Sequence, residues 1–291
     1  MCRLYAMRSS EPTKVECTLV HSQNALLLQS RQDMTGRTHS DGWGIAYYSN
    51  SQPTIERQAS AAFTDLGFSQ VAERVYARTV IAHVRLATVG ELRPENTHPF
   101  SFERWAFAHN GTVEGFESLR TQLITETLPV LNATRLGGTD SEYLFLWLLS
   151  RLVGAGVDLA SGITDLTLTA STVANAIREL AARSSELNLD NKPKLNIVLT
   201  DGDSMIATRW NNSLFYLQRG GLHDCDICGI PHVHHTQEAN YRATVIASEP
   251  LSGETWIEVP NKSVIRIDSD ARMELEPIGL SPASSGTTAG A

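Results

Sequence analysis

Hydrophobic and polar positions along the chain predict strands near both ends and several helices in the middle. In the middle, Leu144, Trp147 and Leu148 recur at the spacing of one helix face. In the last third, short apolar runs alternate with turn residues such as Gly202, a pattern typical of β-structure. We expect strands at residues 3–7, 44–48, 80–86, 104–108, 194–200, 204–210, 214–218, 245–247, 256–259 and 264–267, and helices at 19–29, 71–77, 118–126, 141–152 and 172–182.

This order of elements predicts an α+β domain built in layers, not an alternating parallel α/β domain. The strands at 194–200, 204–210 and 214–218 are expected to form a meander. Thr139 or Asp140 is expected to cap the helix that follows. The chain has no apparent repeat or linker, so we expect one domain over residues 2–277. A Ser/Thr/Gly/Ala-rich tail, residues 278–291, is expected to be disordered.

Composition limits the binding partners and the cellular compartment that we expect for this protein. Of 291 residues, 42% are hydrophobic and 19% charged, and the formal net charge is −8, which is typical of a globular protein and argues against nucleic-acid partners and anionic membranes. Arg3 and Arg8 interrupt any apolar signal core, and the most apolar helical stretch, 143–149, is too short to cross a bilayer. Four cysteines without a signal sequence indicate reduced thiols, so a cytoplasmic location is expected.

The most informative single residue is Cys2, which directly follows Met1. Removal of Met1 is expected to give Cys2 a free α-amine beside its own thiol. Such an amine titrates near ~8 and a thiol near ~8.5, so the two groups can exchange a proton around neutral pH. An N-terminal residue activated by its own amine is a known nucleophile for acyl transfer. The alternative is that Cys2 merely begins a buried strand.

Two further segments combine glycines or an arginine with strand ends. The Asp-Gly-Trp-Gly run at 41–44 is either a site of close backbone approach or an ordinary turn, and Trp43 is expected to pack beneath it. Arg85 ends a predicted strand and is followed by Thr88. Its guanidinium could clamp a carboxylate, or it could form a surface salt bridge.

Asn110-Gly111 and Asp140 offer complementary chemistry. The Asn110 amide and the Gly111 N–H could form an oxyanion hole, although Asn-Gly is also a common turn signal. Asp140 could cap a helix or present its carboxylate to an ammonium group. Histidines near these positions, His83, His98 and His109, are expected to be structural.

These motifs, in this order, resemble the class II glutamine amidotransferase domain, an N-terminal-nucleophile hydrolase. The resemblance is closest to a stand-alone branch that includes the ergothioneine-pathway γ-glutamyl hydrolase and the amidotransferase-like subunit of yeast glutathione degradation. Met-Cys-Arg-Leu at 1–4, the 41–44 run, residues 83–100 and Ile-Ala-Ser-Glu-Pro-Leu at 246–251 carry it, and it covers roughly residues 2–270. The resemblance implies a four-layer α/β/β/α sandwich with catalysis that needs no cofactor.

The resemblance also implies a role for each matching residue. Cys2 is expected to attack the γ-carbonyl of a glutamyl group with its own α-amine as base, giving a thioester that water hydrolyses to glutamate. The remaining roles are the oxyanion hole for Asn110 and Gly111, the α-carboxylate for Arg85 and Thr88, and the α-ammonium for Asp140.

Three functions remain open from the sequence. The chain could hydrolyse a γ-glutamyl peptide or amine, or it could cut glutamine and deliver ammonia to a synthase partner subunit. A peptidase partner is also compatible with the resemblance. A third reading, from a different class, is a non-catalytic interaction subunit with a zinc loop and a vestigial site.

The segment 223–235 stands outside the resemblance because it holds two Cys and four His. Cys-x2-Cys followed closely by His has the ligand types of a tetrahedral zinc site. A solvated loop near the mouth of the active site and a redox-active cysteine pair are the alternatives. Cys17 is expected to be a core residue without a partner. The zinc hypothesis names Cys225, Cys228, His232 and His234 as candidate ligands.

Overall fold

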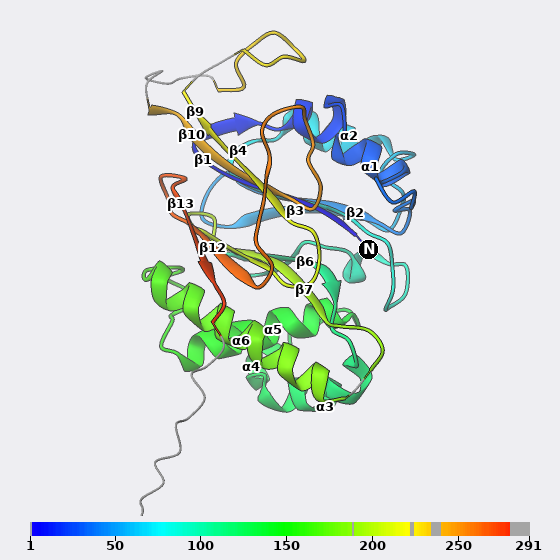
Figure 1. The fold of residues 1–291 in the computed structure, drawn as a ribbon, viewed down its shortest axis with the longest axis vertical. Coiled ribbons are helices and arrows are strands. Elements are labelled where there is room, and N and C mark those ends of the chain that lie inside the picture. Colours follow the sequence, from blue (N-terminus) through cyan, green and yellow to red (C-terminus); the bar gives the residue numbers. More distant parts are fainter. Residues whose placement is uncertain (1, 188, 222–223, 234–239, 280–291) are drawn as a thin grey trace, which may run out of the picture.

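Two antiparallel β-sheets face each other in the computed structural model, which describes residues 2–187, 189–221, 224–233 and 240–279 (Figure 1). The seven-stranded sheet has the order β11-β9-β10-β1-β4-β2-β3, and the six-stranded sheet has the order β13-β12-β8-β7-β6-β5. The first sheet comprises β1 (Arg3–Lys14), β2 (Trp43–Tyr48), β3 (Pro53–Gln58), β4 (Tyr76–Val84), β9 (Phe215–Gly220), β10 (Arg242–Ala247) and β11 (Ile257–Glu258). The second comprises β5 (Phe100–Phe102), β6 (Trp105–Thr112), β7 (Lys194–Thr200), β8 (Met205–Arg209), β12 (Ser263–Ile267) and β13 (Met273–Pro277).

Helices cover the outer face of each sheet and complete four layers (Figure 1). The larger helical layer packs on the six-stranded sheet, where Phe107 of β6 stacks on Phe145 of α5 at 5.1 Å between ring centroids. That layer contains α3 (Phe116–Glu126), α4 (Pro129–Asn132), α5 (Asp140–Gly154) and α6 (Leu166–Glu186). The other side carries the π-helical turn η1 (Cys17–His21), α1 (Leu26–Arg31) and α2 (Leu66–Arg74), while a short 3-10 turn, η2 (Pro94–Asn96), precedes β5.

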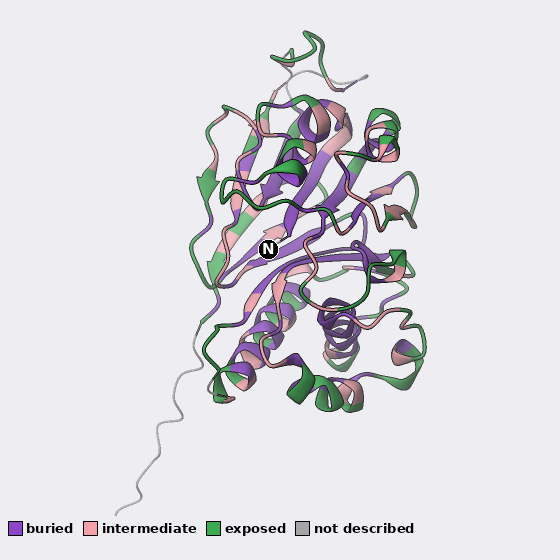
Figure 2. Ribbon diagram, turned by 90° about the vertical axis from the view of Figure 1, so that its right-hand side faces the viewer, coloured by how far each residue is buried: buried purple, intermediate pink, exposed green. Residues whose placement is uncertain are grey.

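Alternation along the strands explains why the sheets are buried on both faces (Figure 2). In β1, Leu4 and Ala6 belong to the core between the two sheets. Tyr5 and Met7 belong instead to the core beneath α1 and α2. Successive strand residues point to opposite faces, so each strand contributes to two separate cores. The predicted α+β class and four-layer sandwich are therefore confirmed.

Most elements predicted from the pattern are present, but the helix expected at 19–29 is divided into η1 and α1 by residues 22–25, and two further predictions are wrong. Residues 71–77 were expected to be helical, but α2 ends at Arg74 and Tyr76 already pairs with Lys14 of β1. Strand pairing outweighs the local helical pattern there. The predicted meander also fails at its third strand, because β9 pairs with β10 and β11 in the other sheet. This choice of sheet depends on partners distant in sequence.

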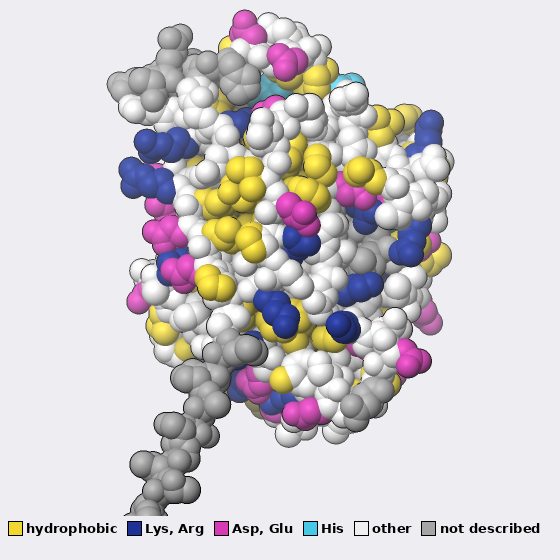
Figure 3. Space-filling view, viewed as in Figure 1, with side chains coloured by type: hydrophobic (Ala, Val, Ile, Leu, Met, Phe, Trp, Pro, Cys, Tyr) yellow, Lys and Arg dark blue, Asp and Glu magenta, His cyan; other side chains and the backbone are white. Residues whose placement is uncertain are grey.

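The structure also bears on the expectations for surface charge, for the C-terminal tail and for membrane-spanning helices. Basic side chains are interspersed with acidic ones on the face in Figure 3 and form no broad basic surface there. Ile278 is buried against the helical core, and residues 280–291 of the predicted tail lie outside the described residues. Within the described residues, helices long and apolar enough to span a membrane are absent.

Candidate active site

The start of β1 is fixed by a buried ion cluster around Arg3. The Arg3 guanidinium pairs with Asp33 (2.5 Å) and with Glu249, and these three residues are at most 5% exposed. The same guanidinium donates a hydrogen bond to the Cys2 carbonyl (3.0 Å). A buried cation is tolerated when it is paired and hydrogen-bonded, so this arrangement holds the backbone of Cys2 in one place.

The Cys2 side chain is buried and lies against residue 86. Its Sγ accepts a hydrogen bond from the Leu86 N–H (3.4 Å) and donates to the Leu86 carbonyl (3.5 Å). Burial raises the pKa of this thiol, whereas the Leu86 contact and the positive charge of Arg85 oppose the rise, and the charge of Asp140 adds to it. The sulfur therefore lies within electrostatic range of both charged groups predicted to bind substrate.

Asn110 and Gly111 lie within β6 and not in a turn. Ala106 and Ala108 of β6 face the space between the sheets, and Asn110 follows them with the same two-residue period. The Asn110 side chain is 0% exposed, yet its Nδ2 and Oδ1 have no hydrogen-bond partner among the described residues. A buried carboxamide without partners is rare, and a catalytic role or a bound water is among its explanations.

Gly111 is required by close packing between strands. A Cβ atom at this position would lie 1.7 Å from the carbonyl oxygen of Lys194 on β7. Any side chain would therefore push β6 away from β7 and displace Asn110. The predicted role of glycine as a point of close backbone approach also holds at Gly44, where a Cβ would lie 2.2 Å from the His98 carbonyl oxygen.

Hydrogen bonds connect β6 to the start of β1 across the two sheets. Asn212 Nδ2 donates to the Asn110 carbonyl (3.2 Å), and the neighbouring Ser213 hydroxyl donates to the Ser248 carbonyl (2.9 Å). Ser248 in turn exchanges hydrogen bonds with the backbone of Leu4. The strand that carries Asn110 and the strand that begins after Cys2 are thus joined at the same end of the interlayer space.

Arg85 lies at the end of β4, and its guanidinium is bound by a short loop. It donates to the carbonyls of Val89 (2.9 Å), Gly90 (3.4 Å) and Glu91 (3.1 Å). Arginine has five N–H donors, so these bonds leave donors for a carboxylate. Thr88, predicted to assist Arg85, is exposed at the start of this loop.

Asp140 is the first residue of α5, and Thr139 is the N-cap, as one of the two predicted alternatives had it. The buried Asp140 carboxylate accepts hydrogen bonds from the Val113 N–H (2.8 Å) and the Ser141 hydroxyl (3.2 Å). Ser141 also contacts Nδ1 of His109 (2.9 Å), whose Nε2 donates to the Lys194 carbonyl (2.8 Å). Burial lowers the pKa of His109, which favours a neutral imidazole with a structural role.

Sequence reasoning assigned no role to Asn96, a buried residue that links two loops of the site. Its Nδ2 donates to the Glu91 carbonyl (3.0 Å), and its Oδ1 accepts from the Gly138 N–H (2.9 Å). It therefore ties the loop that holds Arg85 to the loop that precedes Asp140. The only available signal was its position in the Asn-Thr-His-Pro-Phe run that supported the resemblance.

Other residues singled out in the sequence pack around the site. Trp43 is buried against Phe68 and donates its indole N–H to Asp65 (2.8 Å), so it supports the fold from the outer core. His83 and His98 are both buried, with ring centroids 4.3 Å apart. Burial lowers the pKa of His83 to about 3 and that of His98 well below its usual value. Both rings are therefore neutral at physiological pH.

The Cys/His segment does not lie at the active site. It belongs to the connection between β9 and β10, beyond the end of β1 opposite Cys2 (Figure 1). At about 3.3 Å per residue, β1 separates the two ends by roughly 30–40 Å. The alternative of a solvated loop near the mouth of the candidate active site is therefore wrong.

The prediction that Cys17 has no partner is also wrong. Its sulfur lies in a cluster with Cys225, Cys228 and His232. Burial and the nearby thiols raise the pKa of Cys17 to about 12. His234 lies outside the described residues. A cavity of about 530 Å³ adjoins this cluster, away from Cys2.

Comparison with known proteins gives several similar chains. The probable glutamine amidotransferase DUG3 of Saccharomyces cerevisiae is 28% identical over 306 residues, covering 96% of this chain and 84% of its own. The putative glutamine amidotransferase YafJ of Escherichia coli is 31% identical over 274 residues, covering 89% and 94%. The gamma-glutamyl-hercynylcysteine sulfoxide hydrolase of Mycolicibacterium smegmatis is 25% identical over 284 residues, covering 96% and 100%.

Solved structures and a family model agree with these similarities. A glutamine aminotransferase class-II domain protein from Silicibacter pomeroyi superposes with a TM-score of 0.62 at 22% identity, covering 96% of this chain and all of that one. This likeness supports the same fold. The model for class-II glutamine amidotransferases matches residues 1–274. The chain therefore belongs to the class-II glutamine amidotransferase family.

Proposed function

We propose that this protein hydrolyses a γ-glutamyl amide bond through a thioester on Cys2. The Cys2 sulfur attacks the γ-carbonyl carbon, and its proton passes to the α-amine freed by removal of Met1. The carbonyl electrons move onto oxygen, and the collapse of this tetrahedral adduct expels the amine, which takes the proton. Water then attacks the thioester, and the α-amine of Cys2 accepts the water proton. The C–S bond breaks, the α-amine returns the proton to the Cys2 sulfur, and glutamate leaves.

The buried Asn110 carboxamide is the observation that carries this proposal. Its donor has no partner among the described residues, and it lies on the interlayer face of β6, at the end where β1 begins. A preorganised donor facing a developing oxyanion stabilises the transition state without reorganisation. The Gly111 N–H is proposed as the second donor. The raised pKa of the Cys2 thiol is consistent with a nucleophile that needs a nearby base.

Recognition of the glutamyl group is proposed to rest on two opposite charges. The guanidinium of Arg85, with Thr88, would bind the α-carboxylate, and the carboxylate of Asp140 would bind the α-ammonium. Both charges act on the Cys2 thiol, which supports a common site. Two such contacts would fix the γ-carbonyl for attack and supply part of the rate by orientation.

The name of the mycobacterial relative favours a γ-glutamyl amine as substrate. Cleavage of free glutamine, with ammonia passed to a synthase subunit, uses the same chemistry and is the second candidate. This proposal also accommodates a peptidase partner subunit. The activity itself needs no metal or other cofactor in this scheme.

A glutamine-derived diazoketone tests the nucleophile. Intact-mass and peptide analysis should find one adduct, on residue 2, in a chain that has lost Met1. A Cys2→Ala variant should bind substrate yet release no glutamate. A correctly processed chain that stays unlabelled, or an Ala variant with undiminished turnover, would overturn the proposal.

A panel of γ-glutamyl compounds then identifies the leaving group. Glutamate release from glutamine, glutathione and other γ-glutamyl amines should differ strongly in kcat/KM. Preference for a bulky amine supports the hydrolase. Turnover of glutamine that rises only when a co-purifying subunit is present supports the ammonia-delivering alternative.

A further inference from the structure

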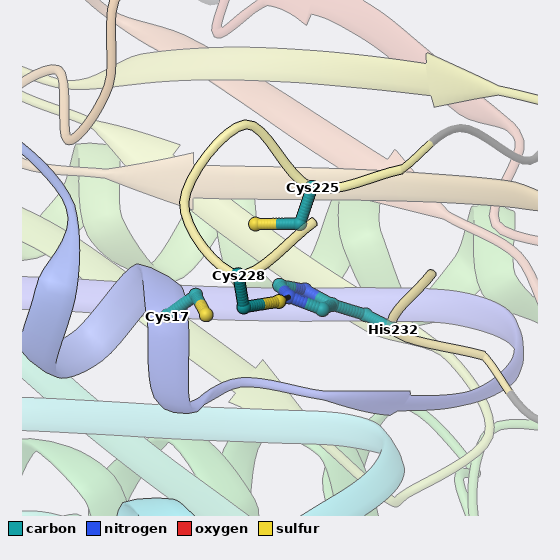
Figure 4. Close-up of side chains that lie close together, drawn as sticks. All are labelled: Cys17, Cys225, Cys228 and His232. Carbon is teal, nitrogen blue, oxygen red and sulfur yellow. Dashed lines mark hydrogen bonds between the residues drawn. The ribbon is translucent and has the colours of Figure 1, made fainter. Parts of the chain in front are cut away.

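We propose that Cys17, Cys225, Cys228 and His232 bind one zinc ion that fastens the β9–β10 connection to the end of β1. The four ligand atoms all lie within 4.8 Å of one another (Figure 4). The cluster differs from the set expected from the sequence because Cys17, from a distant segment, completes it. This proposal is independent of the proposed catalytic function.

The spacing of the ligand atoms approaches that of a tetrahedral site. Zn–S bonds of about 2.3 Å and Zn–N bonds of about 2.0–2.1 Å place sulfurs about 3.8 Å apart and sulfur and nitrogen about 3.6 Å apart. Cys228 Sγ and His232 Nε2 are 3.4 Å apart. A contraction of about 1 Å or less at the widest pair would therefore complete the coordination.

The backbone around Cys225 and Cys228 favours the binding of a metal ion. The Ile227 N–H donates to the Cys225 sulfur (3.4 Å), and the Gly229 N–H donates to the Cys225 carbonyl (2.8 Å). Gly229 closes this turn with φ +71°, a conformation that favours glycine. A backbone N–H directed at sulfur stabilises a thiolate, which is the form that binds metal.

Cys17 lies in a hydrogen-bonded turn beside the loop. It opens the turn η1 (Cys17–His21), which follows β1 after two residues. The Ser22 N–H and hydroxyl both donate to the Cys17 carbonyl, at 2.7 Å and 2.9 Å. On the loop side, the Lys14 N–H donates to the His232 carbonyl (2.9 Å) and brings the imidazole beside β1. The two segments are therefore already adjacent.

The described residues of this loop bury little hydrophobic surface. Among the residues of this loop that the structure describes, Ile227 and Ile230 are 46% and 57% exposed, and Val233 joins a small apolar cluster with Tyr241 and Ala243. The connection runs from Gly220 to Arg242, which is long for a link between adjacent antiparallel strands. A metal ion would supply the cross-link that a core does not.

The donor set selects the type of metal. Three sulfurs and one imidazole nitrogen form a soft, tetrahedral set that favours zinc over magnesium or calcium. Four protein ligands leave no open position, which is typical of a structural site. Its distance from Cys2 along β1 is consistent with a role in folding and not in catalysis.

Elemental analysis of the full-length protein, purified without chelator or added metal, tests the proposal. The parent should carry about one zinc per chain, and native mass spectrometry should show the same stoichiometry. Cys228→Ser and Cys17→Ser should each lose nearly all of this zinc. Two matched controls, Cys2→Ser and His21→Gln, remove a thiol and an imidazole outside the cluster and should retain it.

Two further readouts keep the result decisive if Cys17→Ser fails to fold. Cys228 is exposed, so its variant should fold, and it should show faster proteolysis within the β9–β10 connection. Replacement of zinc by cobalt should give the intense visible absorption of a tetrahedral thiolate site. Parent protein without zinc, a Cys17→Ser variant that keeps full zinc, or a native disulfide between two of these cysteines would overturn the proposal.

Discussion

Substitution of Asn110 by Ala should lower catalysis with a smaller effect on stability. The carboxamide is fully buried and has no hydrogen-bond partner among the described residues. Its removal therefore breaks no hydrogen bond among the described residues. Replacement of a buried polar group by an apolar group of the same shape can be nearly neutral, and truncation to Ala adds the cost of a small cavity. Loss of one oxyanion donor costs about 10²–10³ in kcat, or about 2.7–4 kcal/mol.

Asn196→Ala provides the matched control. Asn196 lies directly opposite Asn110 on β7 and is equally buried. Its amide, however, accepts from the Trp210 N–H (2.7 Å) and donates to the Ser213 carbonyl (3.0 Å). Removal of the Asn196 amide leaves the Trp210 N–H and the Ser213 carbonyl without this partner, which costs about 1–3 kcal/mol of stability for each group. This control should lose stability chiefly, whereas Asn110→Ala should lose kcat chiefly.

Steady-state glutamate release and urea unfolding measure the two quantities. For Asn110→Ala we expect kcat to fall by about two to three orders of magnitude with little change in KM, because the donor acts mainly in the transition state. The free energy of unfolding should fall by less than in Asn196→Ala, because no hydrogen-bond partner is left unsatisfied. A kcat within a few-fold of the parent, or a loss of stability as large as that of Asn196→Ala, would refute the reasoning.

Three other changes test the surroundings of the site. Asp140→Asn keeps an acceptor for the backbone but removes the charge, so KM for glutamine should rise more than kcat falls, and an unchanged KM would contradict the ammonium contact. Glu249→Gln removes the charge of a carboxylate that pairs with Arg3. Urea unfolding should show a loss of about 1–3 kcal/mol in the free energy of unfolding, and glutamate release should fall because the Cys2 backbone is less firmly held. If both values are unchanged, Glu249 has no such positioning role. Burial lowers the pKa of His83 to about 3, so the unfolded state binds more protons below the usual value near 6.5, and stability falls as pH decreases. At pH 5 this lowers the free energy of unfolding by about 2 kcal/mol. Unfolding curves of His83→Gln at pH 7 and pH 5 should lack this decrease. A variant with the same pH dependence as the parent would show that His83 does not titrate in this way.

The sequence predicted the elements whose pattern is local. The helix that became α5 and the strand that became β7 follow from side-chain periodicity, because burial of one face imposes that spacing. The order of the motifs also pointed to the family, since each motif combines a glycine or strand end with a particular functional group. Cys2 and Asn110 could be named from the chain alone, although their roles remain proposals.

Tertiary structure decided what depends on partners far apart in the chain. The β9 strand joins the opposite sheet from β8 because its pairing partner, β10, lies beside β1. Arg3, Asp33 and Glu249 form one ion cluster although more than 200 positions separate its first and last members. Cys17 meets the Cys/His loop for the same reason. Periodicity reports which face of an element is buried, but only the packing of sheets and loops determines which residues meet across that interface.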